Sequence, residues 1–80
     1  MEPEIVGKRV MKLIEKHNIE IGKLASKMQI KEKALKEKLE GKQEFYLDEM
    51  IKIKNIFQLN ARECDELFFA ETTEIEKIRQ

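Results

Sequence analysis

The apolar residues between positions 19 and 45 constrain the fold of this chain more than any other feature. They form two sets, each with the helical spacing that buries one face of a short helix. The first set is Ile21, Leu24, Ala25 and Met28, and the second is Ala34, Leu35 and Leu39. Between them, Ile30 occupies a tight turn. This pattern predicts two short helices packed across a turn, which is a helix-turn-helix.

The second of these helices, residues 31–40, leaves a polar face free. Lys33, Lys36, Glu37 and Glu40 point away from its apolar stripe. A second helix presented in this way is the element that enters the major groove in helix-turn-helix proteins that bind DNA. The sequence therefore predicts a nucleic-acid-binding surface on this helix.

Three further helices are predicted around this pair. They are a helix from about Glu4 to His17, a helix with Asp48 and Glu49 in its first turn, and a last helix from Asn60 to about Phe69. Asn60 and Glu63 have the spacing of a capping box, in which each side chain bonds the other residue's backbone N–H. Phe45 is expected to anchor the loop that precedes the fourth helix.

The length and composition fit one small helical domain. Of the 80 residues, 41% are hydrophobic and 40% are charged, which is typical of helices with Lys and Glu on their outer faces. We therefore expect an all-α, compact five-helix domain over residues 1–70. Residues 71–80 are expected to be a C-terminal tail that is either disordered or involved in a dimer, since Ile75 and Ile78 have no core left to join.

The charges are unevenly distributed although the formal net charge is zero. Residues 21–42 contain seven lysines against three glutamates, a surplus of four positive charges (7 − 3), whereas the end of the chain is acidic. A chain divided in this way can orient its basic side toward a polyanion. The alternative is that interleaved Lys and Glu only solvate the helices through i, i+4 pairs such as Glu32 with Lys36.

Catalysis is not expected of this chain. It has one cysteine, Cys64, and one histidine, His17, so there is no metal set and no nucleophile with a base, and we expect no cofactor. Both residues are expected to pack against the core, Cys64 as a small buried hydrophobe and His17 partly buried. No apolar run approaches the roughly 20 residues that span a bilayer, and the first residues are acidic, so we expect a cytoplasmic protein with no membrane partner.

The order of these elements also resembles a known family. The matching residues are Leu24-Ala25, Ile30, Leu35, Leu39, Gly41-Lys42 and the pattern from Leu59-Asn60 to Leu67-Phe68-Phe69. Over roughly residues 7–69 the chain resembles the Cro and repressor class of phage helix-turn-helix proteins, in particular the small regulators of Gram-positive phages. The resemblance implies a lambda-repressor-like fold and a sequence-specific transcriptional regulator that binds an inverted-repeat operator in double-stranded DNA as a homodimer.

Four residues depart from the family pattern. Ile21 stands where the family usually has a glutamine that reaches a phosphate, and Gln29 replaces the usual glycine of the turn. A left-handed conformation at Gln29 would cost about 1 kcal/mol. Lys31 and Tyr46 replace Ser or Thr caps, and a lysine side chain cannot accept a backbone hydrogen bond. The apolar frame is kept, so the departures concern contact positions and not the fold.

If DNA is the ligand, the helix over residues 31–40 supplies two kinds of contact. Glu32, Lys33, Lys36 and Glu37 are the candidates for base contacts, because lysine donates to guanine and glutamate accepts from cytosine. The candidates for phosphate contacts are Gly22, Lys31 and Lys42. Gly22 would act through the backbone N–H groups at the start of the helix that carries Ile21 to Met28.

A protein-binding module on the same fold is the alternative function. The neutral net charge and the glutamates of the 31–40 helix favour it. Such a module would be an antirepressor or an inhibitor of a host or phage regulator. Its contact surface would be the charged helix or the Phe68-Phe69 end of the domain.

Overall fold

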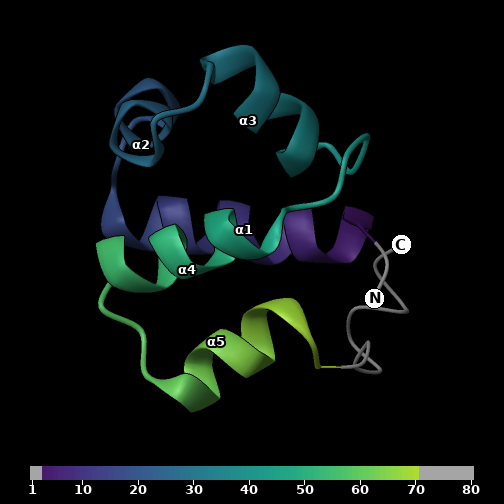
Figure 1. Ribbon diagram of the computed structural model, residues 1–80, viewed down its shortest axis with the longest axis vertical. Coiled ribbons are helices and arrows are strands. Elements are labelled where there is room, and N and C mark those ends of the chain that lie inside the picture. The colour runs from purple at the N-terminus through teal and green to yellow at the C-terminus, as the bar shows by residue number, and fades with distance from the viewer. Residues whose placement is uncertain (1–2, 71–80) are drawn as a thin grey trace.

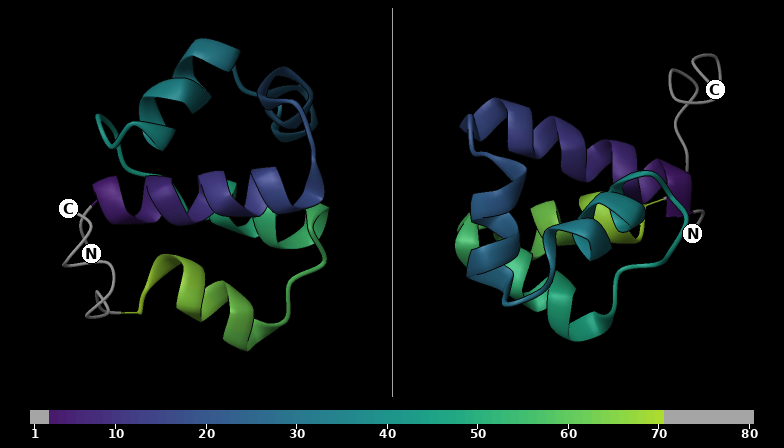
Figure 2. Two further views of the ribbon diagram at one scale, coloured as in Figure 1. Left: turned by 180° about the vertical axis from the view of Figure 1, so that it is seen from behind. Right: turned by 90° about the horizontal axis from the view of Figure 1, so that it is seen from above.

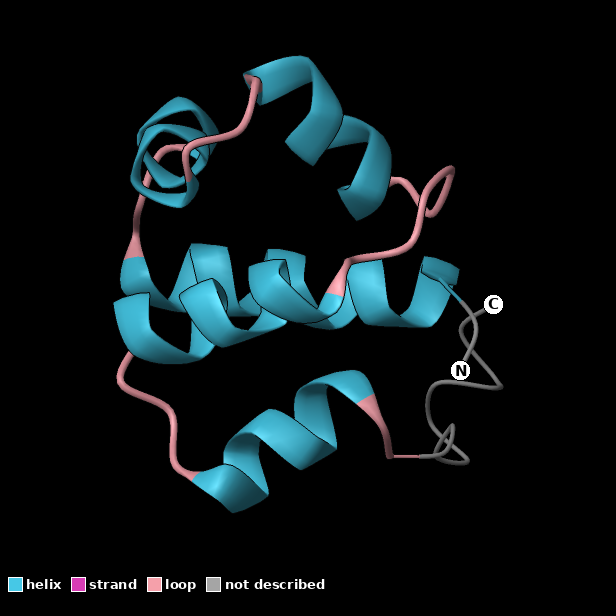
Figure 3. Ribbon diagram, viewed as in Figure 1, coloured by secondary structure: helices cyan, strands magenta, loops and turns pink. Residues whose placement is uncertain are grey.

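Five helices and no strand make up the part of the chain that the computed structural model describes, residues 3–70 (Figures 1 and 3). The helices are α1 (Pro3–His17), α2 (Ile21–Met28), α3 (Glu32–Leu39), α4 (Leu47–Ile56) and α5 (Ala61–Phe68). The expected all-α fold is therefore confirmed. The expectation for the tail, including Ile75 and Ile78, concerns residues outside this range.

The helices form three levels. In the front and rear views α2 and α3 lie at one end of the molecule, α5 lies at the other, and α1 and α4 cross the region between them (Figures 1 and 2). Helix α2 is seen nearly along its axis while α3 lies across the view, so the two helices cross steeply. Helix α3 packs against α1 and α2 and otherwise stands at the outer edge of the domain.

The core is built from the apolar stripes of all five helices. Its buried residues include Val10, Ile14, Leu24, Ala25, Met28, Leu35, Leu39, Phe45, Ile53 and Phe68. Phe45 is buried as expected and anchors the loop before α4. Two residues are less buried than expected: His17 is exposed, although its ring lies 4.9 Å from that of Phe57, and Cys64 is only half-buried. His17 is the last residue of α1, where one side stays open to solvent, whereas Cys64 does pack against the core as expected although it is not fully buried.

The turn between α2 and α3 has the predicted left-handed residue. Gln29 adopts φ 61° and ψ 39°, and the N–H groups of Gln29 and Ile30 bond back to the end of α2. Lys52 of α4 adds a further bond by donating its Nζ to the carbonyl of Met28 at 2.8 Å. Lys31 begins α3 without a side-chain cap, as its chemistry predicts. Backbone hydrogen bonds and one hydrogen bond from the side chain of Lys52 therefore stabilise a turn that contains no glycine.

Local capping starts the last helix as expected. The Asn60 side chain accepts from the Glu63 N–H at 2.7 Å, and the Glu63 carboxylate accepts from the Asn60 N–H at 3.0 Å. At the start of α4 the Glu49 carboxylate accepts from the Tyr46 N–H at 2.8 Å. This bond is the half of a capping box in which the N3 glutamate accepts from the N–H of the N-cap residue, whereas a Ser or Thr cap would accept from the N–H of the N3 residue.

Helix α1 approaches the end of α3 so closely that only glycine fits at the crossing. A Cβ atom on Gly7 would overlap the Leu39 carbonyl oxygen and would lie 2.9 Å from that of Lys38. These are backbone atoms of α3, which cannot move aside as a side-chain end can. Gly7 therefore sets the distance between the central helix and α3.

Replacing Gly7 with alanine is expected to lower the free energy of unfolding by about 1–3 kcal/mol, because the added methyl group forces the two backbones apart. Gly22→Ala is the matched control, since its Cβ meets only the flexible end of the Glu32 side chain. The control should leave stability unchanged or raise it slightly. Urea unfolding followed by circular dichroism measures both, and equal effects at the two positions would contradict the close-crossing argument.

Candidate nucleic-acid interface

The outward face of α3 is open to solvent, as the apolar pattern predicts. Leu35 and Leu39 are buried against the rest of the domain. The exposed residues on or next to α3 are Lys31, Glu32, Lys33, Lys36, Glu40 and Lys42. Six charged side chains therefore surround a helix that stands at the edge of the molecule (Figure 2).

Two of the four candidate base contacts are paired with one another. The Nζ of Lys36 lies 3.0 Å from the Glu32 carboxylate one turn earlier, and both side chains are about half exposed. This is the i, i+4 pair that the solvation alternative predicted. An exposed pair of this kind contributes only about 0.3–0.5 kcal/mol, so a competing ligand can break it at little cost.

The other two candidates differ in their surroundings. Glu37 is half-buried, and its carboxylate accepts a hydrogen bond from the side-chain amide of Gln43 at 2.6 Å. Lys33 is exposed and has no ion pair or side-chain hydrogen bond with any residue in the range 3–70. Lys33 is therefore the base candidate whose charge is directly available to a ligand.

Gly22 lies beside a carboxylate. A Cβ atom on Gly22 would be 2.7 Å from the Glu32 Oε1, so this oxygen lies next to the first turn of α2. The charged residues that border the open groove alongside are Glu15, Glu20, Glu32 and Lys36. The free N–H groups of a helix N-terminus favour an anion, but here a side-chain anion of the protein already lies nearby. A phosphate at Gly22 would be repelled unless Glu32 moved away.

The two lysines predicted to hold phosphates are both exposed. Lys42 follows α3, and its Nζ lies 3.7 Å from the Glu40 carboxylate, a weak pair at a highly exposed site. Lys31 precedes α3 and has no such partner among the described residues. Lys23 and Lys27 on α2 are also exposed and without an ion pair in this range. Four lysines without an ion pair in residues 3–70 therefore lie on α2 and at the N-terminal end of α3, and Lys8, Lys12 and Lys16 of α1 are exposed in the same way.

Lys38 is buried, in contrast to the exposed position expected of a lysine in this basic stretch. It was counted in the basic surplus, yet its side chain is only 2% exposed and its Nζ lies 2.9 Å from the carboxylate of Glu49, itself 5% exposed. The same Nζ donates to the Glu44 carbonyl at 3.1 Å. The spacing contains the signal, because Lys38 follows Leu35 by three residues and precedes Leu39 on the buried stripe. One of the seven lysines is therefore neutralised inside the domain.

Tyr46 is an aromatic contact residue that the sequence analysis treated only as a poor helix cap. The Lys38 Nζ lies 4.0 Å from the centroid of its ring, a cation–π arrangement. The side chain is nevertheless 62% exposed. The buried ammonium thus holds a large amphipathic side chain at the surface, next to the loop that follows α3.

Residues 3–70 contain no group of three or more His, Cys, Asp or Glu side chains arranged to hold a metal ion. Within the same range, no helix combines the length and the apolar content needed to cross a membrane.

Replacing Lys38 with methionine is expected to lower the free energy of unfolding by about 3–5 kcal/mol, because Glu49 would be left charged and unpaired in the interior. The double variant Lys38→Met/Glu49→Gln should recover most of this loss, since the amide oxygen can still accept from Tyr46. Urea unfolding of the parent, both single variants and the double variant measures the coupling. Simple additivity of the two single effects would show that the ion pair does not act as a unit.

Comparison with known proteins finds no relative of this chain. The chain matches no protein-family profile, no curated protein and no solved structure. The resemblance to the Cro and repressor class therefore stays a prediction drawn from the residues themselves.

Proposed function

We propose that this protein binds double-stranded DNA by placing α3 in the major groove. The observation that carries the proposal is the presentation of α3, whose apolar side is locked into the core while its polar side stands free at the edge of the domain. The N-terminal residues of such a helix are those that contact base edges in helix-turn-helix complexes. Here this end carries the unpaired Lys31 and Lys33.

The available side chains divide naturally into two roles. Lys33 reaches toward base edges, where an ammonium group prefers guanine, and Lys31 and Lys42 hold phosphates on either side of the groove. Lys36 and Glu32 join the contact only if their pair opens. With so few cationic contacts the binding of one copy is weak at cellular salt, so a regulator of this kind acts as a homodimer on an inverted repeat.

The first experiment measures binding to random duplex DNA by fluorescence anisotropy at several salt concentrations. Affinity should fall steeply with salt, and the double variant Lys31→Ala/Lys33→Ala should bind more weakly. Its salt slope should be smaller by about one unit for each phosphate that the protein no longer neutralises. Arg62→Ala is the control, because it removes one positive charge from the exposed surface of α5, far from α3.

The control variant should bind DNA like the parent protein. Binding that is insensitive to salt, or equal in the double variant and the control, would contradict the proposal. A circular dichroism spectrum of each variant confirms that the helices are intact.

A protein-binding function remains the second candidate, and one observation favours it. The charged residues that border the groove at the start of α2 are Glu15, Glu20, Glu32 and Lys36, so carboxylates outnumber the one ammonium group at the position where a phosphate was expected. Its floor includes the apolar residues Met11 and Ile19. A negatively charged border around an apolar floor suits a protein segment with basic and apolar side chains better than it suits a nucleic acid.

Replacing Glu32 with glutamine distinguishes the two candidates. On random duplex DNA the variant should bind more tightly than the parent, because a negative charge is removed beside Gly22 and Lys36 loses its ionic partner. Glu66→Gln, on α5, is the matched control and should change nothing. Unchanged or weaker DNA binding in Glu32→Gln would favour the protein-binding function. Anisotropy at low salt gives the readout.

A further inference from the structure

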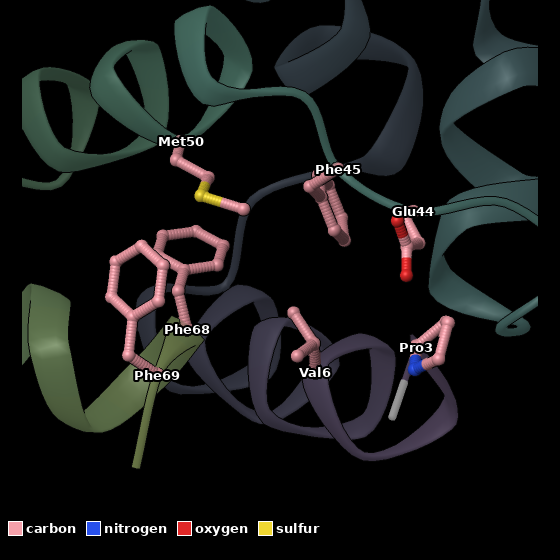
Figure 4. A pocket seen from close by; sticks show the side chains of 7 residues that line it. All are labelled: Pro3, Val6, Glu44, Phe45, Met50, Phe68 and Phe69. Carbon is pink, nitrogen blue, oxygen red and sulfur yellow. The ribbon is translucent and has the colours of Figure 1, made fainter. Parts of the chain in front are cut away.

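An apolar pocket opens beside the loop that joins α3 to α4. It has a volume of about 190 Å³ and lies between the start of α1, the beginning of α4 and the end of α5 (Figure 4). Its apolar lining residues are Pro3, Val6, Phe45, Met50, Phe68 and Phe69. Glu44, beside Pro3, is the charged residue at its border. The proposed DNA-binding role uses none of these side chains.

The pocket has rigid walls and one uncovered aromatic side. Phe68 is buried and its ring meets that of Phe45 edge to face, with centroids 6.0 Å apart. The next ring, that of Phe69, is 56% exposed at 6.4 Å from Phe68. Met50 is half-buried and lies close to both phenylalanines in the view of the pocket (Figure 4). Phe69 and the apolar lining of the pocket form one continuous apolar surface, which is the kind of surface that an apolar side chain can cover.

The chain leaves α5 at the mouth of this pocket. Arg9 of α1 donates from Nη1 to the carbonyl oxygens of Glu66, at 3.1 Å, and Ala70, at 2.9 Å. These bonds fix the end of α5 against α1. The ten residues that follow Ala70 in the sequence therefore start directly beside Phe69.

The sequence of those ten residues suits the pocket. Their only large apolar side chains are Ile75 and Ile78. Five residues of extended chain span up to about 17 Å, which is ample to bring Ile75 back over Phe69. Lys77 and Arg79 flank Ile78 and can complement the carboxylate of Glu44, whereas Glu74 and Glu76 flank Ile75, so Ile78 is the isoleucine whose neighbours suit this border of the pocket.

We propose that this pocket is the docking site of the chain's own segment 71–80, with Ile75 and Ile78 covering Met50 and Phe69. The segment thereby completes the core beside the loop that joins α3 to α4. Docking does not depend on the proposed DNA binding, because it uses none of the side chains assigned to DNA contacts. Failure of either proposal leaves the other standing.

The test is nuclear magnetic resonance on the full chain with labelled methionine and isoleucine methyl groups. The Met50 methyl is expected to show nuclear Overhauser contacts to the δ1 methyl of Ile75 or Ile78. The intensity of these contacts, relative to the protein concentration, should stay unchanged over a twentyfold dilution. In the variant Ile75→Asp/Ile78→Asp these contacts should vanish and the Met50 resonance should shift. Met28, which is fully buried elsewhere in the core, should not shift.

A matched variant, Thr72→Asp/Thr73→Asp, adds the same charge to the same segment and should keep the contacts. Removal of the two isoleucines should also lower the ratio of folded to unfolded protein by about tenfold or more, whereas the threonine variant should not. Contacts that disappear on dilution would assign the pocket to a second copy and overturn the proposal. Contacts from Met50 to Met1 alone, or a Met50 resonance equal in all three proteins, would also overturn it.

Discussion

The ion pair between Lys38 and Glu49 is the interaction on which the presentation of α3 most depends. It joins the last turn of α3 to the first turn of α4 in a place where neither charge reaches solvent. The same two side chains bond the Glu44 carbonyl and the Tyr46 N–H, so the loop between the helices is tied to the pair. Because a lone buried charge is costly, α3 cannot turn about its axis without losing all these partners together. Close contact at Gly7 fixes the same helix from the α1 side.

With α3 held in this way, the balance of charge around it decides what it can bind. Lys31 and Lys33 are open at its N-terminal end, whereas the Glu32 carboxylate lies over the start of α2. The open lysines favour binding of a polyanion, whereas the Glu32 carboxylate opposes binding of a phosphate to the same surface. For the proposed function, this opposition predicts that one copy binds DNA weakly and in a salt-sensitive way.

Much of the helical framework was predictable, because it depends on residues within one or two turns of each other. The stripe from Leu24 to Met28, the left-handed Gln29 and the capping box at Asn60 are all confirmed. The burial of Lys38 was missed although it lies on the apolar stripe, because periodicity identifies a face but not the carboxylate that makes burial of an ammonium group acceptable. Cys64 packs against the core as expected but is only half-buried, since an apolar neighbourhood in sequence does not fix how completely another helix covers a residue.

The sequence by itself determined the five helices, the turn between α2 and α3 and the polar flank of α3, since spacing, caps and turn chemistry act locally. Only the tertiary structure decided which charges are available. Packing brought Lys38 to Glu49 and Glu32 to Gly22, and it left Lys33 alone. It also placed Phe69 beside an open apolar pocket at the end of α5. Such pairings join separate helices, so they follow from the shape of the assembled core and not from any local pattern in the chain.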